Sequence, residues 1–287
     1  MKDIITLLRP HQYVKNIFIF APLVFAFNLS QDALLNAAVA FILFSILASS
    51  IYILNDYMDI EEDKKHPTKC NRPLASGVIS KKSAITLFLI LSTLTLFISS
   101  MFSQNLFYVL LAYFLLNVSY SLGLKHISLL DIFIIATGFV LRLFAGAQVT
   151  DTPLSMWIII ITFLLATFLA LAKRRDDVLL SLEGKETRKN IDGYNLEFVN
   201  AAMVLMSGVV IVSYLQYTVS PEVITRVGSE YLYLTTLFVV LGILRYMQIT
   251  FVEGASGSPT KVLLKDRFIQ ITLLLWLLSF IAIVKLT

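Results

Sequence analysis

An apolar run of membrane length, 33–54, ends abruptly in the stretch Asn55-Asp56-Tyr57-Met58-Asp59-Ile60-Glu61-Glu62-Asp63. Asp56, Asp59 and Asp63 stand at positions i, i+3 and i+7, so a helix that continues through them would place all three carboxylates on one face. Bases follow at once, in Lys64-Lys65-His66-Pro67-Thr68-Lys69-Cys70-Asn71-Arg72-Pro73. The sequence therefore predicts an acidic stripe at a membrane surface, with basic residues beside it.

Like charges at this spacing weaken a helix unless a cation lies between them. Carboxylate oxygens suit a hard ion such as Mg²⁺, which usually takes one or two carboxylates together with substrate phosphates. The bases that follow could donate to phosphate oxygens beside the metal. We therefore interpret the stretch as a site for Mg²⁺ and a diphosphate; the alternative is a solvated acidic helix end.

The composition places the chain in a bilayer. Of its 287 residues, 57% are hydrophobic and 15% are charged, with a mean hydropathy of +0.81, whereas soluble domains carry about 25% charged residues. A single cysteine, Cys70, excludes an internal disulfide, and the three histidines lack the spacing of a zinc site. The chain is therefore expected to be a membrane protein without a cysteine-based or histidine-based metal centre.

Apolar runs bounded by charge predict about nine transmembrane helices. With a cytoplasmic N-terminus, nearly all of the 23 Lys and Arg fall on the cytoplasmic side, as do the long polar loops 55–83 and 173–195. We predict an all-α bundle forming one domain, 1–287, in the cell (inner) membrane, with a central cavity capped by cytoplasmic loops. The expected spans lie near 14–29, 33–54, 84–102, 105–122, 129–148, 154–172, 196–219, 229–250 and 266–286.

Some bases need a separate explanation. Arg142 lies deep inside a predicted span, which costs at least a few kcal/mol unless it meets a polar partner. The candidates are a bound phosphate or a polar residue on another helix, such as Asn117 or Tyr120. Lys125, like Lys81 and Lys82, is interpreted as a base that only sets the topology.

Near the N-terminus, four polar residues recur on one side of a short helix: Arg9, Gln12, Lys15 and Asn16. A basic anchor at the membrane interface is one explanation for them. A phosphate-binding role for Lys15 and Asn16 is the other.

Two motifs resemble a known family. The pattern Asn55-Asp56-x-x-Asp59-x-x-x-Asp63, with His66-Pro67-Thr68-Lys69 and Asn71-Arg72-Pro73-Leu74-Ala75-Ser76-Gly77 downstream, resembles the first aspartate motif of the UbiA superfamily of intramembrane prenyltransferases. Within that superfamily, Leu8-Arg9-Pro10-His11-Gln12-Tyr13-Val14-Lys15-Asn16 is similar to the branch of phosphoribosyltransferases that act on decaprenyl phosphate. The resemblance runs nearly end to end.

A second D-x-x-x-D motif, which most members of the superfamily carry, is absent here. In its place stands Lys173-Arg174-Arg175-Asp176-Asp177, followed by Arg188, Lys189 and Tyr194. The branch named above is basic and tyrosine-bearing in this region, which implies that these side chains contact phosphates. A phosphoribosyl diphosphate and a lipid phosphate bring additional anions that bases could hold. The alternative is a basic cluster that touches anionic lipid headgroups.

The resemblance implies Mg²⁺-dependent transfer of a 5-phosphoribosyl group from phosphoribosyl diphosphate to a polyprenyl (decaprenyl-type) phosphate, releasing diphosphate, in cell-envelope polysaccharide (cell wall) precursor synthesis. The expected catalytic residues are Asp56, Asp59 and Asn55, and the metal ligands are Asp56, Asp59 and Asp63. The expected substrate-binding residues are Lys15, Asn16, Lys64, Arg72, Arg142, Lys173, Arg188, Lys189 and Tyr194.

Two other functions stay open at this point. One is a UbiA-type transfer of a prenyl group from an allylic diphosphate to an aromatic or quinone precursor, and the other is a non-catalytic membrane transporter. The partners expected are the two phosphorylated substrates and the lipid bilayer. No nucleic acid is expected, and a homo-oligomer is left open.

Overall fold

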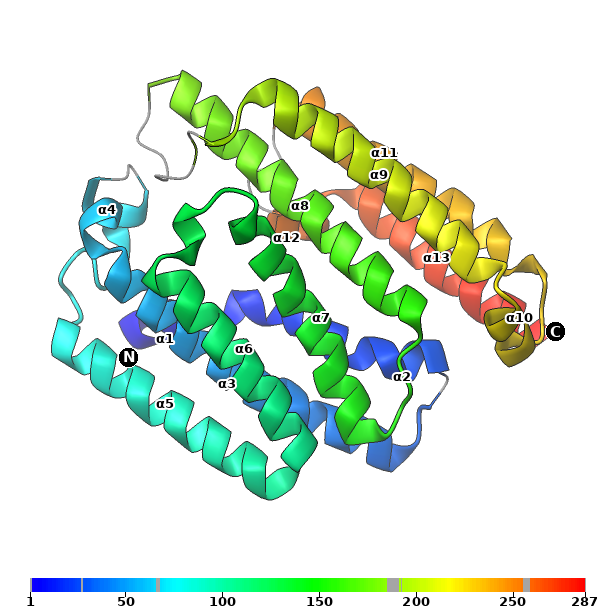
Figure 1. Ribbon diagram of the computed structural model, residues 1–287, viewed down its shortest axis with the longest axis horizontal. Coiled ribbons are helices and arrows are strands. Elements are labelled where there is room, and N and C mark those ends of the chain that lie inside the picture. The colour runs from blue at the N-terminus through cyan, green and yellow to red at the C-terminus, as the bar shows by residue number, and fades with distance from the viewer. Residues whose placement is uncertain are drawn as a thin grey trace. The chain divides into compact units, whose positions relative to one another are not determined.

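The computed structural model describes residues 2–26, 28–65, 68–184, 191, 193–254 and 259–286. These residues form helices joined by turns, and none of them lies in a strand, which confirms the predicted all-α fold (Figure 1). The chain divides into two compact units, Met1–Ser155 with Gly184–Gly193 and Met156–Glu183 with Tyr194–Thr287. We call them the N-terminal unit and the C-terminal unit and describe each by itself.

Eight segments among the described residues are long and apolar enough to cross a membrane, so the chain is a multi-pass membrane protein. They are α3 (Gln31–Met58), α5 (Lys81–Phe102), α6 (Gln104–Leu122), α7 (Leu130–Thr150), α8 (Met156–Leu182), α9 (Leu196–Thr218), η5 with α11 (Tyr231–Thr235 and Thr236–Phe251), and α13 (Arg267–Leu286). The shorter elements are α1 (Lys2–Leu8), η1 (Pro10–Phe20), α2 (Ala21–Ala26), α4 (Ile60–Lys65), η2 (Lys69–Asn71), η3 (Leu124–His126), α10 (Pro221–Val227) and α12 (Pro259–Lys265).

The segment expected as a first span near 14–29 is not one long helix. It consists of the eleven-residue 3-10 helix η1 followed by the short helix α2. Pro22 has no backbone N–H to donate to the preceding turn, and Ala21 bonds the carbonyl of Phe18, three residues back, instead of continuing an α-helical pattern. The apolar run is therefore real, but its backbone is not that of a straight crossing helix.

Helix α3 lies at the centre of the N-terminal unit and contacts α5, α6, α7 and η1. It begins where the side chain of Ser30 accepts a hydrogen bond from the N–H of Ala33, and it continues through 28 residues without Gly or Pro. Two-thirds of its apolar window is buried (67%), more than in any of the other candidate spans. Its core side chains Phe44 and Leu47 are fully buried, so packing on all sides holds this helix in place.

Helix α5 shows how a span divides between protein and lipid. Its buried side chains recur every three or four residues along one face: Ala84, Phe88, Ser92, Thr95 and Ser99. Most are small, so α5 approaches its neighbours closely, and the Ser92 hydroxyl donates to the carbonyl of Phe88 in its own helix at 2.7 Å. Exposed apolar side chains such as Phe97 and Met101 cover the other face.

Gly146 of α7 is required for the position of η1. A Cβ added at Gly146 would lie 1.8 Å from the carbonyl oxygen of Ile19, far inside van der Waals contact. The backbones of α7 and η1 therefore touch at this point. This contact fixes the position of η1, which carries Lys15 and Asn16 and directly follows Arg9.

In the C-terminal unit, α8 packs along α9, while α11 contacts α9 and α13. Arg175 joins three of these helices, because its guanidinium donates to the Asn200 side chain at 2.9 Å and to the carbonyl of Thr250 at 2.7 Å. The Thr250 carbonyl lies in the last turn of α11, where a cation is favourable. The buried base is thus used to tie α8 to α9 and α11.

Candidate functional site

The predicted acidic stripe is interrupted at its middle member. Helix α3 ends at Met58, Asp59 adopts a non-helical conformation (φ −96°, ψ 6°), and α4 begins at Ile60. The expectation of one continuous helix face was therefore wrong. Asp56 projects from α3, Asp59 lies at the break, and Asp63 belongs to α4, so the three carboxylates do not form one stripe along a single helix.

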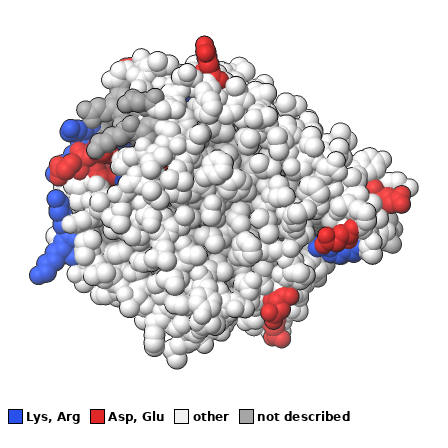
Figure 2. Space-filling model, viewed as in Figure 1, with Lys and Arg blue, Asp and Glu red and all other residues white. Residues whose placement is uncertain are grey.

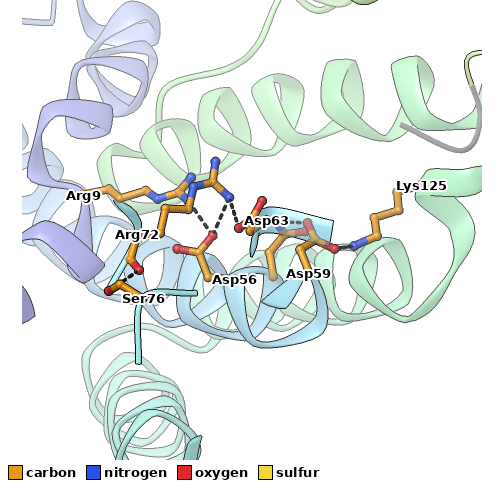
Figure 3. Close-up of polar contacts among 8 residues, drawn as sticks. Arg9, Asp56, Asp59, Asp63, Arg72, Ser76 and Lys125 are labelled. Carbon is orange, nitrogen blue, oxygen red and sulfur yellow. Dashed lines mark hydrogen bonds and ion pairs between the residues drawn. The ribbon is translucent and has the colours of Figure 1, made fainter. Parts of the chain in front are cut away.

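Asp56 and Asp63 share one arginine. Arg72 places its NH1 nitrogen 3.0 Å from Asp56 Oδ1 and 2.7 Å from Asp63 Oδ2 (Figure 3). Asp56 also accepts a hydrogen bond from Arg9 at 2.5 Å. Both carboxylates are almost fully buried, with relative exposures of 2% and 4%, and buried carboxylates need such cationic donors.

The loop after α4 holds Arg72 in this position. Arg72 follows the short helix η2 and closes its turn by donating its N–H to the carbonyl of Lys69. Ser76 then donates to the carbonyl of Arg72 at 2.9 Å, and Gly77 turns the chain with a positive φ of 78°. The structure therefore brings Arg72 to Asp56, 16 residues away in the sequence, and to Asp63, 9 residues away.

Asp59 is paired with Lys125, which comes from η3 after the end of α6 (Figure 3). The Lys125 side chain is only 7% exposed, so the interpretation of Lys125 as a base that merely sets topology was wrong. A burial this deep is uncommon for lysine unless it has a charged partner. The available signal in the sequence was its place on the same predicted side of the membrane as the acidic stretch.

Asn55 contributes an oxygen atom that has no partner. Its amide nitrogen donates to Asp59 Oδ2 at 3.1 Å, while its Oδ1 is buried without a hydrogen bond. Among the described residues, no three His, Cys, Asp or Glu side chains converge as a ready-made metal site. The oxygen donors present nevertheless fit Mg²⁺, which needs few protein ligands when phosphate oxygens complete its shell.

Lys64, expected to bind phosphate, lies outside this cluster. It is exposed and pairs with Glu61 at 3.0 Å, and this contact holds the pKa of the Glu61 carboxyl below its usual range. Figure 2 shows the charged side chains of this region gathered over α4 and the start of α5. Exposed pairs of this kind contribute little to stability.

The segment η1 brings a second set of polar residues to α3. Arg9 takes a left-handed backbone conformation (φ 54°, ψ 54°), which turns the chain just before Pro10 and sets its guanidinium over the ring of Tyr52. Four residues on, the Tyr13 hydroxyl bonds Ser49 at 2.9 Å. Arg9, which was expected only as part of an interfacial anchor, therefore reaches the acidic site.

Lys15 is half-buried and lies close enough to Arg9 and Arg142 to interact with both electrostatically. In the described part of the chain it has no hydrogen-bond or ion-pair partner. Like charges in a partly buried place repel each other, so this region of the N-terminal unit is suited to an anion.

Arg142 is held by polar groups of its own helix and of two others. Its guanidinium donates to Asn16 at 2.8 Å, to the carbonyl of Gly138 at 2.7 Å and to the Tyr113 hydroxyl at 3.4 Å. Asn16 in turn donates to Ser45 at 2.8 Å. The expectation of a polar partner on another helix is confirmed, but the residues are Asn16 of η1 and Tyr113 of α6 instead of the examples Asn117 and Tyr120, because η1 packs against α7 and brings Asn16 to the guanidinium.

Three aromatic rings surround the same guanidinium, those of Phe44, Tyr113 and Phe139, at 4.8 to 5.2 Å from their centroids. Arg142 is 4% exposed and Asn16 is 1% exposed. Every nitrogen of the guanidinium already donates a hydrogen bond inside the protein. Direct phosphate binding by Arg142 and Asn16 would require this network to open.

The remaining predicted residues belong to other parts of the chain. Lys173 is half-buried in α8 of the C-terminal unit, and Tyr194 is 6% exposed, with its ring 6.3 Å from that of Phe198. The neighbouring Arg174 is buried and pairs with Asp177 at 2.5 Å. Arg188 and Lys189 lie outside the described residues.

The fold and the site together define a class: a multi-pass helical membrane protein that holds buried carboxylates, paired with bases, at the end of the spanning helix α3. The model of the UbiA prenyltransferase family matches residues 16–271. The chain belongs to this family, whose members are transferases, as the resemblance of its aspartate motif implied.

Known relatives match along almost the whole chain. The decaprenyl-phosphate phosphoribosyltransferase of Mycolicibacterium smegmatis is 32% identical, over 96% of this chain and 91% of that protein. The protein of the same name from Corynebacterium glutamicum is 30% identical, over 94% of this chain and 82% of that protein. A solved UbiA homologue from Archaeoglobus fulgidus, bound to DMAPP and Mg²⁺, shares the fold with a TM-score of 0.71 at 17% identity, covering 99% of this chain and 100% of that one.

Proposed function

We propose that this chain transfers a 5-phosphoribosyl group from phosphoribosyl diphosphate to a polyprenyl phosphate of the decaprenyl type, as a step in making cell-envelope polysaccharide precursors. The name of the relatives that match nearly end to end supports the lipid acceptor and the phosphoribosyl group that is transferred. One observation on the site supports the chemistry. Asp56 and Asp63 share Arg72, so carboxylates suited to a metal and a guanidinium suited to phosphate lie within one hydrogen bond of each other.

In the proposed reaction, the bond between the ribose C1 and the diphosphate breaks, and a bond from C1 to a phosphate oxygen of the lipid forms. Mg²⁺, held by Asp56, Asp59 and Asp63 with Asn55, would neutralise the charge of the departing diphosphate. Arg72 and Lys125 lie beside these carboxylates and would donate to its oxygens. The lipid phosphate is already an anion, so the acceptor needs no general base.

Lys15 is the candidate for a further phosphate, either that of the lipid or the 5-phosphate of the donor. It has two bases near it and no acidic partner in the described part of the chain, which is the arrangement that an additional anion would neutralise. We place the acidic site and its loops at the cytoplasmic face of the inner membrane, because loops rich in Lys and Arg favour that face. Soluble phosphorylated metabolites reach that face.

The test is diphosphate release by the purified full chain with Mg²⁺. One reaction contains phosphoribosyl diphosphate and a polyprenyl phosphate, and the other contains an allylic diphosphate and an aromatic acceptor. We expect release in the first reaction alone, dependent on the lipid and abolished by Asp56→Ala. Lys82→Met, which changes an exposed base and leaves the described ion pairs of the three carboxylates in place, is the matched control and should keep its activity. Release in the second reaction alone would assign the chain to aromatic prenyl transfer instead.

A further inference from the structure

Each carboxylate that the proposed function assigns to a metal already has a basic partner within the protein. Arg72 lies between Asp56 and Asp63, and Lys125 pairs with Asp59. We infer that Arg72 and Lys125 occupy these carboxylates until the metal arrives together with a diphosphate, and that the two bases then move onto the diphosphate oxygens. The ligands named here rest on the proposed function, whereas the ion pairs are features of the chain itself.

Burial explains why the bases are needed before any ligand binds. Asp56 and Asp63 are 2% and 4% exposed, so water cannot stabilise their charges and a cation must do so. The side chains of Arg72 and Arg9 are 27% and 19% exposed. The acids are thus enclosed while Arg72 and Arg9 keep contact with solvent, which allows an arriving anion to reach these two bases without the site unfolding.

The charges of the cluster decide the order of binding. Asp56, Asp59 and Asp63 are balanced by Arg9, Arg72 and Lys125. A divalent ion entering alone would add charge to a balanced cluster and would push bases from their carboxylates with no anion to receive them. A diphosphate carries enough negative charge to offset the ion, and its oxygens are good hydrogen-bond acceptors for Arg72 and Lys125.

The geometry of the ligand set agrees with a metal site that is only partly formed. The NH1 nitrogen of Arg72 lies 3.0 Å from Asp56 and 2.7 Å from Asp63, so a positive charge of the chain already bridges these two acids. Beside Asp59, the buried Oδ1 of Asn55 accepts no hydrogen bond, and a buried acceptor left without a partner is unfavourable. Moving the bases onto a diphosphate would free the carboxylate oxygens, which would then be available to the metal together with Asn55 Oδ1.

The experiment measures binding of Mn²⁺, which has the same preference for oxygen ligands as Mg²⁺. The full chain in detergent is dialysed against Mn²⁺, with or without inorganic diphosphate in both compartments, so that any Mn²⁺–diphosphate complex in solution cancels. We expect the affinity of the chain for Mn²⁺ to rise by about tenfold or more when diphosphate is present. We expect Asp56→Ala to retain no Mn²⁺ in the dialysis, either with or without diphosphate. This result would locate the bound ion at the cluster.

Removing a base should strengthen the binding of Mn²⁺ alone and reduce the gain in Mn²⁺ affinity that diphosphate gives. Lys125→Met and Arg72→Gln are expected to bind Mn²⁺ alone more tightly than the wild type, because a carboxylate is released, and to lose most of the gain from diphosphate. Lys82→Met is the matched control and should behave as the wild type. The elution volume of each variant on a sizing column verifies that it is folded. The comparison of Mn²⁺ binding by the wild type with and without diphosphate tests the inference even if a variant does not fold.

The inference fails if the wild type binds Mn²⁺ equally well with and without diphosphate, or if Lys125→Met and Arg72→Gln, eluting as folded protein, bind the metal alone less tightly. Its failure is separable from that of the proposed function. Turnover of phosphoribosyl diphosphate by a chain that binds Mn²⁺ tightly on its own would overturn the order of binding and leave the proposed reaction standing. Joint binding of Mn²⁺ and diphosphate without turnover of phosphoribosyl diphosphate would do the reverse.

Discussion

The N-terminal unit buries charge in two different ways. At the end of α3, acids are matched with bases, as Asp56 and Asp63 are with Arg72. Deeper in the same unit, Arg142 pairs with no acid among the described residues and is held instead by neutral oxygens and aromatic rings. The first arrangement can exchange one charged partner for another, whereas the second offers no charged partner to exchange. The comparison suggests that the first cluster serves ligand binding and that the second serves packing.

Replacing Asp56 with Asn gives the sharpest test of the first cluster. The change removes the charge shared by Arg9 and Arg72, and we expect the rate of diphosphate release to fall by at least about 100-fold. The thermal midpoint in detergent should change little, because the amide retains the shape of the carboxylate. If instead the protein unfolds and the residual folded fraction is fully active, the ion pairs hold the fold and not the ligand.

Gly146→Ala tests the close contact between α7 and η1, the two elements that carry Arg142 and Asn16. The new methyl group would lie 1.8 Å from the Ile19 carbonyl oxygen, so the backbone of η1 must move. We expect the free energy of unfolding to fall by about 3 kcal/mol or more, measured by denaturant titration in detergent. Gly208→Ala, where a Cβ meets no atom within 4 Å, is the matched control. Equal stability of the two variants would show that η1 is not fixed at this contact.

Arg142→Met tests the network itself. The change removes the donors to Asn16 and to Tyr113 while keeping an unbranched side chain among the rings. We expect a loss of about 1 to 3 kcal/mol of stability, because the Asn16 oxygen is left buried without a partner, and no more than a modest change in the metal affinity measured with diphosphate. Loss of ligand binding with unchanged stability would place Arg142 in the substrate site after all.

The smallest expected effect is that of Tyr13→Phe. This change removes the bond from the Tyr13 hydroxyl to Ser49 at 2.9 Å and leaves the ring. Ser49 still donates to the carbonyl of Leu8 at 2.7 Å, so we expect a loss of about 1 kcal/mol or less. The shift of the thermal midpoint measures it. A large loss of activity here would show that the contact between η1 and α3 belongs to the ligand site.

Most of the fold followed from the sequence, because apolar runs of membrane length leave few alternatives to helices. Hydropathy could not show that the run near 14–29 contains a 3-10 helix, since the effect of Pro22 depends on local hydrogen bonding. In the same way, the acids after α3 were recognisable, but their spacing alone predicted one helix face where the structure has a break at Asp59.

The partners of the site residues were harder to predict than the residues themselves. Arg72 and Asp63 are near in sequence and were both expected at the site. Lys125 meets Asp59 across 66 residues, and Arg142 meets Asn16 across 126. Such pairings depend on how helices pack, and a single sequence contains no direct record of that. Composition therefore identified the charged groups, while the tertiary structure decided which of them neutralise one another.

The bond between Arg142 and Asn16 also bears on how the protein is made. An arginine near the middle of a membrane helix raises the cost of inserting that helix by about 2.5 to 3.5 kcal/mol. The chain emerges from the ribosome from its N-terminus, so Asn16 and Ser45 are synthesised before α7. When α7 enters the bilayer, the residues that solvate its arginine are already available, and the order of the chain itself lowers the barrier to assembly.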